Sequence, residues 1–201
     1  GVFTDNYPLD KGKINAKEGG TRVPFIIKGP GIPANIQSNV LVNGLDFYPT
    51  ILSWTGTPKP AEHHLDGVDL STLLATNPQD CQLLKEPSGE VRNSMMHHFP
   101  HGGGAMHSTL RIGGYKLIRN FDYHHREPLE LYQLYNDAGE RVDIEEMNNL
   151  ATAMPKKAAE MNQLLQARLE SMDASFPYFN PQSRVSNKPL INSDKVCVVT
   201  E

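Results

Sequence analysis

Basic side chains gather in one short stretch, residues 13–24, which reads KINAKEGGTRVP. Two lysines precede the glycine pair Gly19-Gly20, and Arg22 follows it, directly before an apolar run that begins at Val23. A lysine ammonium is a compact cation suited to the oxygens of an anionic ester, and paired glycines let the backbone approach a partner closely. The stretch therefore predicts an anion-binding loop, with an ordinary solvated surface turn as the alternative.

A second group that could do chemistry is the histidine cluster His97, His98 and His101. Imidazole titrates near neutrality, so a histidine at a cleft can protonate a leaving oxygen. Three neighbouring imidazoles could instead bind a metal ion, although no cysteine or carboxylate completes the spacing of such a site. A third interpretation is a pair of surface imidazoles beside a strand. Three further histidines are expected at the surface: His63, His64 and His107.

The composition predicts a globular protein and limits its partners. The chain has 201 residues, 38% of them hydrophobic and 21% charged, and a formal net charge of −4. A negative balance without a long basic run argues against nucleic-acid binding. The longest apolar run, Val23 to Ile27, is far too short to span a bilayer, so no membrane association is expected. Cys81 and Cys197 lack metal-site spacing and either stay free or form one disulfide.

The N-terminal half has the pattern of an α/β domain. Val23–Lys28 is expected to be a strand that ends at a Gly-Pro turn, and Asn39–Val42 a second, shorter strand. Asp46 is a good N-cap for a helix that runs to Gly56. A shorter helix is predicted for Asp69–Ala75. Residues 76–93 contain several proline, glycine and serine residues and are predicted to be a linker.

The C-terminal half has the pattern of an α+β unit. Strands at Ser108–Ile112 and Tyr115–Arg119 flank Gly113-Gly114, which is a hairpin signal, and Leu129–Tyr135 is a third strand. A long helix is expected from Pro155 to about Ala174, capped by Thr152. It is predicted from apolar residues that recur every three or four positions, namely Ala158, Met161, Leu165, Leu169 and Met172.

Several motifs occur in an order that resembles the sulfatases, the arylsulfatase-type members of the alkaline-phosphatase-like superfamily. The most specific is Lys-x-x-x-x-Glu-Gly-Gly-x-Arg-x-Pro, which begins at Lys13. The resemblance covers residues 4 to about 181 and implies the C-terminal part of that fold, with residues 1–90 in the large α/β domain and residues 91–201 in a small subdomain. The other matching segments are residues 4–13, 29–32, 45–50, 65–70, 98–101, 110–118 and 130–134.

The resemblance implies roles for individual residues. Lys13 stands where the family has a lysine that contacts the sulfate ester, and Lys17 falls at a variable position and is expected to be a surface lysine. His98 and His101 would lie at the rim of the sulfate pocket, where they contact the substrate or protonate the leaving oxygen. His124-His125 is a weaker pocket candidate. Glu18, Gly19, Gly20 and Arg22 would shape the turn that presents Lys13, and an ordinary structural interpretation of Arg22 is a pair with a carboxylate.

Two parts of the sulfatase machinery have no counterpart in this sequence. The family's formylglycine arises from a Cys/Ser-x-Pro-x-Arg motif, which does not occur here. Its calcium site uses an Asp-Asn-Gly, whereas Asp5-Asn6 is followed by Tyr7. Calcium and formylglycine are therefore expected in the full-length family but not in this chain, and no metal site is predicted. We expect a C-terminal fragment that is inactive without the N-terminal half of the same enzyme, its partner.

The expected substrate of the whole enzyme is a sulfated carbohydrate or an aryl sulfate, and the family's habit of export predicts a periplasmic or secreted location. Two alternatives stay open. A phosphodiesterase or phosphonate hydrolase would keep the fold and change the ester. A non-catalytic module that binds sulfated glycans would explain the missing nucleophile. The chain by itself is also expected to expose apolar surface around Val23–Ile27 or to self-associate.

Overall fold

The structure is a computed structural model, and it describes residues 5–101, 106–121 and 127–177. The described chain forms two compact units. One consists of residues 24–94, and the other combines residues 5–23 with the C-terminal part from residue 95 onward. The loop that carries Lys13 therefore belongs with the C-terminal sheet. The division predicted at residue 90 concerns the domains of a whole enzyme and stays a prediction.

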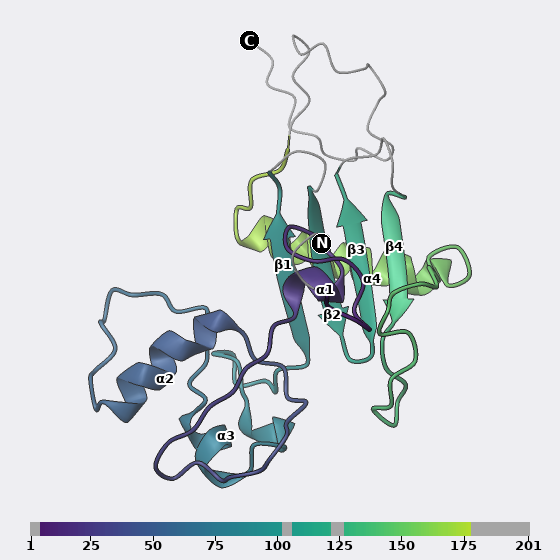
Figure 1. The fold of residues 1–201 in the computed structure, drawn as a ribbon. Coiled ribbons are helices and arrows are strands. Elements are labelled where there is room, and N and C mark those ends of the chain that lie inside the picture. The colour runs from purple at the N-terminus through teal and green to yellow at the C-terminus, as the bar shows by residue number, and fades with distance from the viewer. Residues whose placement is uncertain (1–4, 102–105, 122–126, 178–201) are drawn as a thin grey trace. The chain divides into compact units, whose positions relative to one another are not determined.

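The C-terminal unit is built on an antiparallel sheet of four strands in the order β1-β2-β3-β4 (Figure 1). Leu110 of β2 lies opposite Leu117 of β3, and Ile112 opposite Tyr115, so the turn between them is the predicted Gly113-Gly114. All three predicted strands are confirmed, and the last is shorter than expected. The strands are β1 (Ser94–Phe99), β2 (His107–Ile112), β3 (Tyr115–Asn120) and β4 (Leu129–Gln133).

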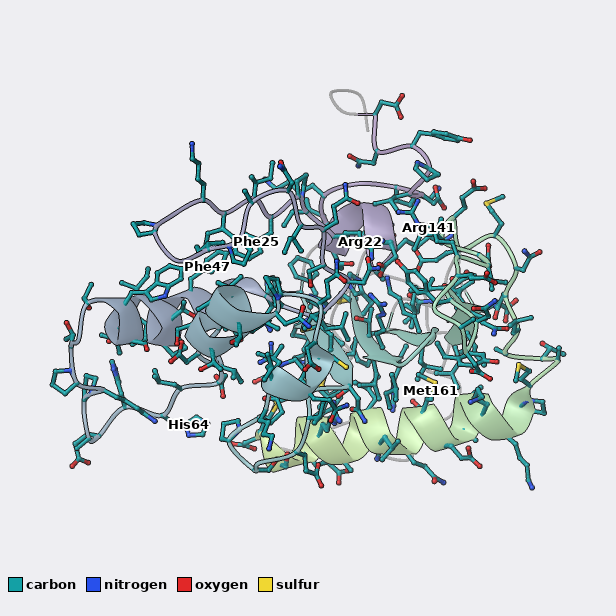
Figure 2. All side chains as sticks on the ribbon, turned by 90° about the horizontal axis from the view of Figure 1, so that it is seen from below. Arg22, Phe25, Phe47, His64, Arg141 and Met161 are labelled. Carbon is teal, nitrogen blue, oxygen red and sulfur yellow. The ribbon has the colours of Figure 1, made fainter. Side chains whose placement is uncertain are left out.

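One face of this sheet is covered by the long helix α4, Pro155–Ser171, as predicted. Its apolar residues pack on Leu110, Leu117 and Leu131, one from each of three neighbouring strands. Met161, labelled in Figure 2, is one of these helix residues. The predicted cap Thr152 is wrong, because the helix begins three residues later and Met154 is its N-cap, without a side-chain hydrogen bond.

The opposite face of the sheet is covered by residues 5–23, which include the four-residue helix α1, Glu18–Thr21 (Figure 1). Ala16 packs there against Ile118, Tyr132 and Leu134 in a second apolar cluster. Side chains alternate between the faces of a strand, so Leu117 faces α4 while Lys116 and Ile118 face the N-terminal segment. The sheet thus forms a platform that holds the Lys13 loop.

The other unit, residues 24–94, is helical. Its core consists of Leu70, Leu73, Leu74 and Leu84. Both predicted helices are confirmed within a few residues, but residues 76–93 are folded rather than a linker, because Leu84 is buried and Lys85 bridges to Val91. The elements are η1 (Gly44–Asp46), α2 (Phe47–Trp54), α3 (Ser71–Thr76) and η2 (Cys81–Leu83). None of the helices within the described ranges is long and apolar enough to cross a membrane.

The strands predicted for Val23–Lys28 and Asn39–Val42 do not form in this structure. Pro24 has no N–H to donate, and within the described residues no strand lies beside either segment to pair with it. The side chains of Val23 and Ile26 are consequently 76% and 91% exposed. This confirms the expected exposure of apolar surface around Val23–Ile27.

Asp46 precedes α2 as predicted, but its carboxylate does not cap that helix. It accepts hydrogen bonds from the backbone N–H of Asn43 and of Val68, at 2.8 and 2.9 Å. It also forms a bidentate pair with Arg92, at 2.7 and 3.0 Å. Since both partners are buried, this pair ties the start of α2 to the end of the unit.

Candidate functional site

Lys13 lies exposed in a tight turn of the N-terminal segment. Its neighbours Lys11 and Ile14 have φ angles of 65° and 73°, in the left-handed region. A β-branched residue such as Ile14 adopts that region only where surrounding contacts enforce it. The turn is closed by the Asn15 N–H, which donates to the carbonyl of Gly12 at 3.2 Å. The backbone that carries Lys13 is therefore held in one defined conformation.

The glycine pair makes this turn possible. The Gly19 N–H donates to the carbonyl of Asp10 at 3.1 Å. A Cβ on Gly19 would clash with that carbonyl oxygen, and a Cβ on Gly20 would clash with the carbonyl oxygen of Asn15. Only glycines therefore allow the segment before Lys13 to lie against α1. This confirms the prediction that the glycine pair shapes the turn.

The basic side chains around Lys13 are engaged within the protein. Lys17 donates to Asp10 Oδ2 and to the carbonyl of Glu146, each at 2.8 Å, and its ammonium lies 5.4 Å from the centre of the Tyr132 ring. The prediction that Lys17 is a surface lysine is therefore wrong, because its ammonium is hydrogen-bonded to Asp10 and to Glu146. Burial raises the pKa of Asp10, but the bond and charge of Lys17 together with Lys11 outweigh burial and lower this pKa.

Arg22 lies at the C-terminal end of α1 and is bonded within the protein. Its guanidinium donates to the Tyr135 hydroxyl at 2.8 Å and lies 3.7 Å from Glu18 Oε2. The expected pairing of Arg22 with a carboxylate is confirmed. By contrast, within the described residues Lys13 has no hydrogen-bond or ion-pair partner, so its ammonium is free to meet an anion from solution.

A buried charge cluster lies beneath α1, where Lys116 of β3 meets two carboxylates. Its ammonium lies 2.8 Å from Glu18 Oε1 and 3.0 Å from Glu146 Oε1. Burial raises the pKa of Glu18, but the positive charges of Lys116, Arg111 and Arg22 together outweigh burial, and the pKa falls below its usual value. For Glu146 burial outweighs Lys116 and raises the pKa. The N-terminal segment is thus fastened to the sheet by charge as well as by apolar packing.

His98 does not lie with Lys13. Its Nε2 donates to the carbonyl of Ser175, after α4, at 2.8 Å, and its Nδ1 lies 2.7 Å from Ser108 Oγ. Its ring also contacts Phe121 and Phe176. His98 therefore faces the α4 side of the sheet, whereas Lys13 belongs to the segment on the other side. The structure does not bring these two predicted site residues together.

His97 instead points to the face that carries the N-terminal segment, because successive side chains of a strand alternate. Its Nδ1 lies 3.4 Å from Thr109 Oγ1. Burial, and then the nearby positive charge of Lys116, lower the pKa of His97. The sequence does not distinguish His97 from the other histidines of the cluster. The alternation along β1 is the signal that distinguishes it from His98.

The remaining histidines divide into exposed and buried ones. His101 is exposed, and its ring centre lies 4.5 Å from that of Phe99. His63 and His64 are exposed as expected. The surface prediction for His107 is wrong, because it is buried at the start of β2 with its ring stacked on Phe99. His124-His125 lies outside the described residues.

The described residues do not fit a calcium or formylglycine centre. The Asp5 carboxylate accepts the Tyr7 N–H at 2.9 Å, and Asp10 is paired with Lys17. In the described ranges no three His, Cys, Asp or Glu side chains are grouped to hold a metal ion. Cys81 is exposed and forms no disulfide with the described residues, and Leu83 and Lys85 stand where the formylglycine motif requires proline and arginine.

Comparison with known proteins identifies relatives over most of the chain. Residues 10–174 match the family N-sulphoglucosamine sulphohydrolase, C-terminal. A sulfatase from Formosa agariphila is 30% identical over 150 residues, which cover 70% of this chain and 26% of the relative. Arylsulfatase K from Rattus norvegicus is 31% identical over 189 residues, which cover 89% of this chain and 30% of the relative.

A solved structure supports the fold. The crystal structure of Ps i-CgsB superposes with a TM-score of 0.61 at 23% identity, over 86% of this chain and 34% of that one. The chain thus spans about a third or less of the length of these proteins. Together with the family match over most of its residues, this establishes that the chain belongs to the sulfatase family, in whose C-terminal region its fold is found.

Proposed function

We propose that this chain supplies the sulfate-binding lysine, Lys13, of a sulfatase that hydrolyses sulfate esters of carbohydrates or aryl alcohols. One observation carries the proposal. Four basic side chains lie between residues 10 and 22, and three of them, Lys11, Lys17 and Arg22, have carboxylate partners. Lys13 is exposed and, within the described part of the chain, has none. It is also the residue that the Lys-x-x-x-x-Glu-Gly-Gly motif singles out.

The chemistry of the reaction requires such a cation. A sulfate ester carries a full negative charge on its oxygens, and more charge develops on the bridging oxygen as the ester bond breaks. A preorganised donor aimed at this charge stabilises the transition state, and removal of one typically costs about 10²–10³ in rate. The rigid turn around Lys13 provides the preorganisation.

The proton for the leaving alcohol is assigned to a histidine. In this proposal His98 is the proton donor and His101 binds the substrate, as the resemblance implies. His101 is exposed and needs no rearrangement. His98 lies on the α4 face, across the sheet from the Lys13 segment, and is bonded to Ser108 and Ser175, so its role as proton donor requires a rearrangement of β1 as well as of the segment after α4.

The nucleophile and the metal are proposed to come from outside this sequence. In the sulfatase family a formylglycine would supply the nucleophile and calcium the neutralising charge, and the residues present here do not fit that centre. We therefore expect no turnover by the isolated chain. The matched family acts on an N-sulfated amino sugar according to its description, which favours a sulfated glycan as substrate. A periplasmic or secreted location remains part of the proposal.

The test uses the full-length protein that contains this sequence. Steady-state hydrolysis of a sulfated glucosamine and of an aryl sulfate is measured for the parent, Lys13→Ala and Lys11→Ala. Lys13→Ala is expected to lower kcat/KM by about 10²–10³, whereas Lys11→Ala, two residues away, leaves it within about twofold. Equal effects of the two variants would contradict the proposal. Faster hydrolysis of the matching phosphate esters would favour a phosphodiesterase or phosphonate hydrolase.

The sequence itself favours one other function, a non-catalytic module for sulfated glycans. The observation is an exposed Lys13 in a chain that lacks a formylglycine motif. Calorimetric titration of a sulfated disaccharide into this chain and into Lys13→Ala separates the two cases. Affinity that is lost in the variant indicates a binding module, and no affinity indicates a part of an enzyme.

A further inference from the structure

Glu146 is the residue at which the Lys13 loop and the sheet are joined. It lies in the segment after β4, more than a hundred residues from Lys13, and its carboxylate is almost fully buried. We propose that Glu146 is a positioning residue for Lys13, which sets the place of the Lys13 ammonium without touching the substrate. This inference rests on the proposed function of Lys13.

The protein holds Glu146 in an unusual backbone conformation. Its φ angle is 54°, in a region that non-glycine residues seldom adopt. Asp143 enforces this conformation. The Glu146 N–H donates to the Asp143 carbonyl at 3.0 Å, and the Asp143 carboxylate accepts the N–H groups of Met147 and Asn148 at 2.9 and 3.0 Å. The segment is thus built to insert one carboxylate beneath α1.

Glu146 makes two direct contacts with the loop. Its Oε2 accepts the backbone N–H of Glu18 at 2.5 Å, and its carbonyl accepts the Lys17 ammonium at 2.8 Å. These are the fifth and fourth residues after Lys13. A side chain and a backbone oxygen of one residue therefore fix two successive positions at the C-terminal end of the turn.

The other end of the turn is tied to the same point. The Lys17 ammonium that binds the Glu146 carbonyl also binds Asp10 Oδ2 at 2.8 Å. The carbonyl of Asp10 accepts the Gly19 N–H. Lys13 thus lies in a closed loop between Asp10 and Lys17, and both ends of this loop are anchored through Glu146. A shift of Glu146 would be transmitted to Lys13 from both sides.

Charge makes this anchor specific. Glu146 Oε1 also lies 3.0 Å from Lys116, so the residue that fixes the loop is itself fixed to the sheet. Glu146→Gln retains the size and an acceptor for the Glu18 N–H but loses the negative charge that faces Lys116. The amide of the glutamine side chain also brings an N–H donor next to the Lys116 ammonium, which is itself a donor. The substitution should therefore displace the anchor without removing atoms.

The experiment uses the full-length protein and a double-mutant cycle. KM and kcat for a sulfated glucosamine are measured for the parent, Glu146→Gln, Lys13→Ala and the double variant, with the folded fraction checked by thermal unfolding. Glu145→Gln is the matched control, because Glu145 is the exposed neighbour in the same segment. Since small misplacements of a binding group cost up to about 10²-fold, Glu146→Gln is expected to raise KM about tenfold or more, and Glu145→Gln to leave it unchanged.

Positioning through Lys13 also predicts that the effects are not additive. In the Lys13→Ala background, Glu146→Gln should have no further effect on KM, because the group that it positions is absent. A role in stability alone would reduce the amount of folded enzyme and leave KM as it is. If Glu146→Gln does not fold, Lys17→Gln decides the question in the same cycle, since it removes the bonds of the Lys17 ammonium to Asp10 and to the Glu146 carbonyl and keeps the Glu146 side chain.

The outcomes separate this inference from the proposed function. If Lys13→Ala leaves KM and kcat unchanged, the proposed function of Lys13 is wrong and the positioning role falls with it. If Lys13→Ala impairs the enzyme but Glu146→Gln and Lys17→Gln leave KM unchanged, or act additively with Lys13→Ala, the positioning inference alone is overturned. A raised KM that disappears in the Lys13→Ala background supports it.

Discussion

The ammonium of Lys116 lies 2.8 Å from Glu18 Oε1, and this buried bond joins residues 98 positions apart in the sequence. It links the start of β3 to α1, directly after the turn that carries Lys13. A buried ion pair adds little net stability compared with apolar residues, but loss of one partner leaves an uncompensated charge. The pair therefore contributes mainly by fixing the position of the loop on the sheet.

The first prediction concerns pH. Because the pKa of Glu18 in the folded protein is below its usual 4.5, Glu18 stabilises the fold above that pH, and this stability is lost as the pH falls through the lowered pKa. The raised pKa of Glu146 acts in the opposite direction. The difference in free energy of unfolding between the parent chain and Glu18→Gln should shrink from about pH 6 to about pH 3. Urea unfolding followed by circular dichroism measures it, and a difference that stays constant would contradict the prediction.

The glycine pair gives a second prediction. Gly20→Ala places a Cβ against the Asn15 carbonyl, so the Lys13 turn must open. We expect a loss of about 3 kcal/mol in stability, at the upper end of ordinary substitutions, and a raised KM in the full-length enzyme. Gly44→Ala is the control, because no atom lies near the added methyl. Comparable losses in both variants would show that the turn does not depend on Gly20.

A third prediction tests the helix that covers the sheet. Leu165 of α4 is fully buried, whereas its neighbour Leu164 is 49% exposed. Leu165→Ala should cost about 2–5 kcal/mol, because it leaves a cavity against the sheet. Leu164→Ala should stay within about 0.5 kcal/mol of the parent. Thermal unfolding of the two variants side by side measures the difference. A similar loss of stability in both would contradict the orientation of α4 in which Leu165 is buried and Leu164 is exposed.

The fourth prediction concerns the unit of residues 24–94. Arg92→Met removes the guanidinium that pairs with the buried Asp46 and with Glu86. The stranded carboxylate of Asp46 should destabilise this unit by about 3–5 kcal/mol. Trp54, the single tryptophan, lies in α2 and reports on this unit by fluorescence. An unfolding midpoint unchanged at this probe would contradict a role for the pair.

The fifth prediction concerns exposed apolar side chains. Ile26 of the same unit is almost fully exposed, and α2 exposes Phe47, Ile51 and Trp54. Phe25 packs on Phe47 with ring centres 5.1 Å apart (Figure 2). Exposed apolar side chains in such number bind hydrophobic dyes or promote association. We expect the chain to enhance the fluorescence of such a dye, and Ile26→Ser with Ile51→Ser to reduce the signal. A monomeric chain without dye binding would contradict this.

Local patterns in the sequence determined much of the C-terminal unit. The hairpin at Gly113-Gly114 and α4 depend on turn chemistry and on a helical repeat of apolar residues, and both are legible within a few neighbouring residues. The motif that begins at Lys13 likewise identified the family, because it is a local run. The strands predicted around Val23 failed, since a strand needs a partner and the described residues provide none there.

Only the tertiary structure decided which charges remain available. The sequence presents Lys13 and Lys17 as similar lysines, and it was the approach of Asp10 and of Glu146, far apart in the chain, that consumed Lys17. The tertiary structure also separated His97 from His98, because α4 covers one face of the sheet and the N-terminal segment covers the other. Hydrogen bonds and ion pairs between distant segments depend on the packing of the whole unit, and residue types and short spacings do not contain that information.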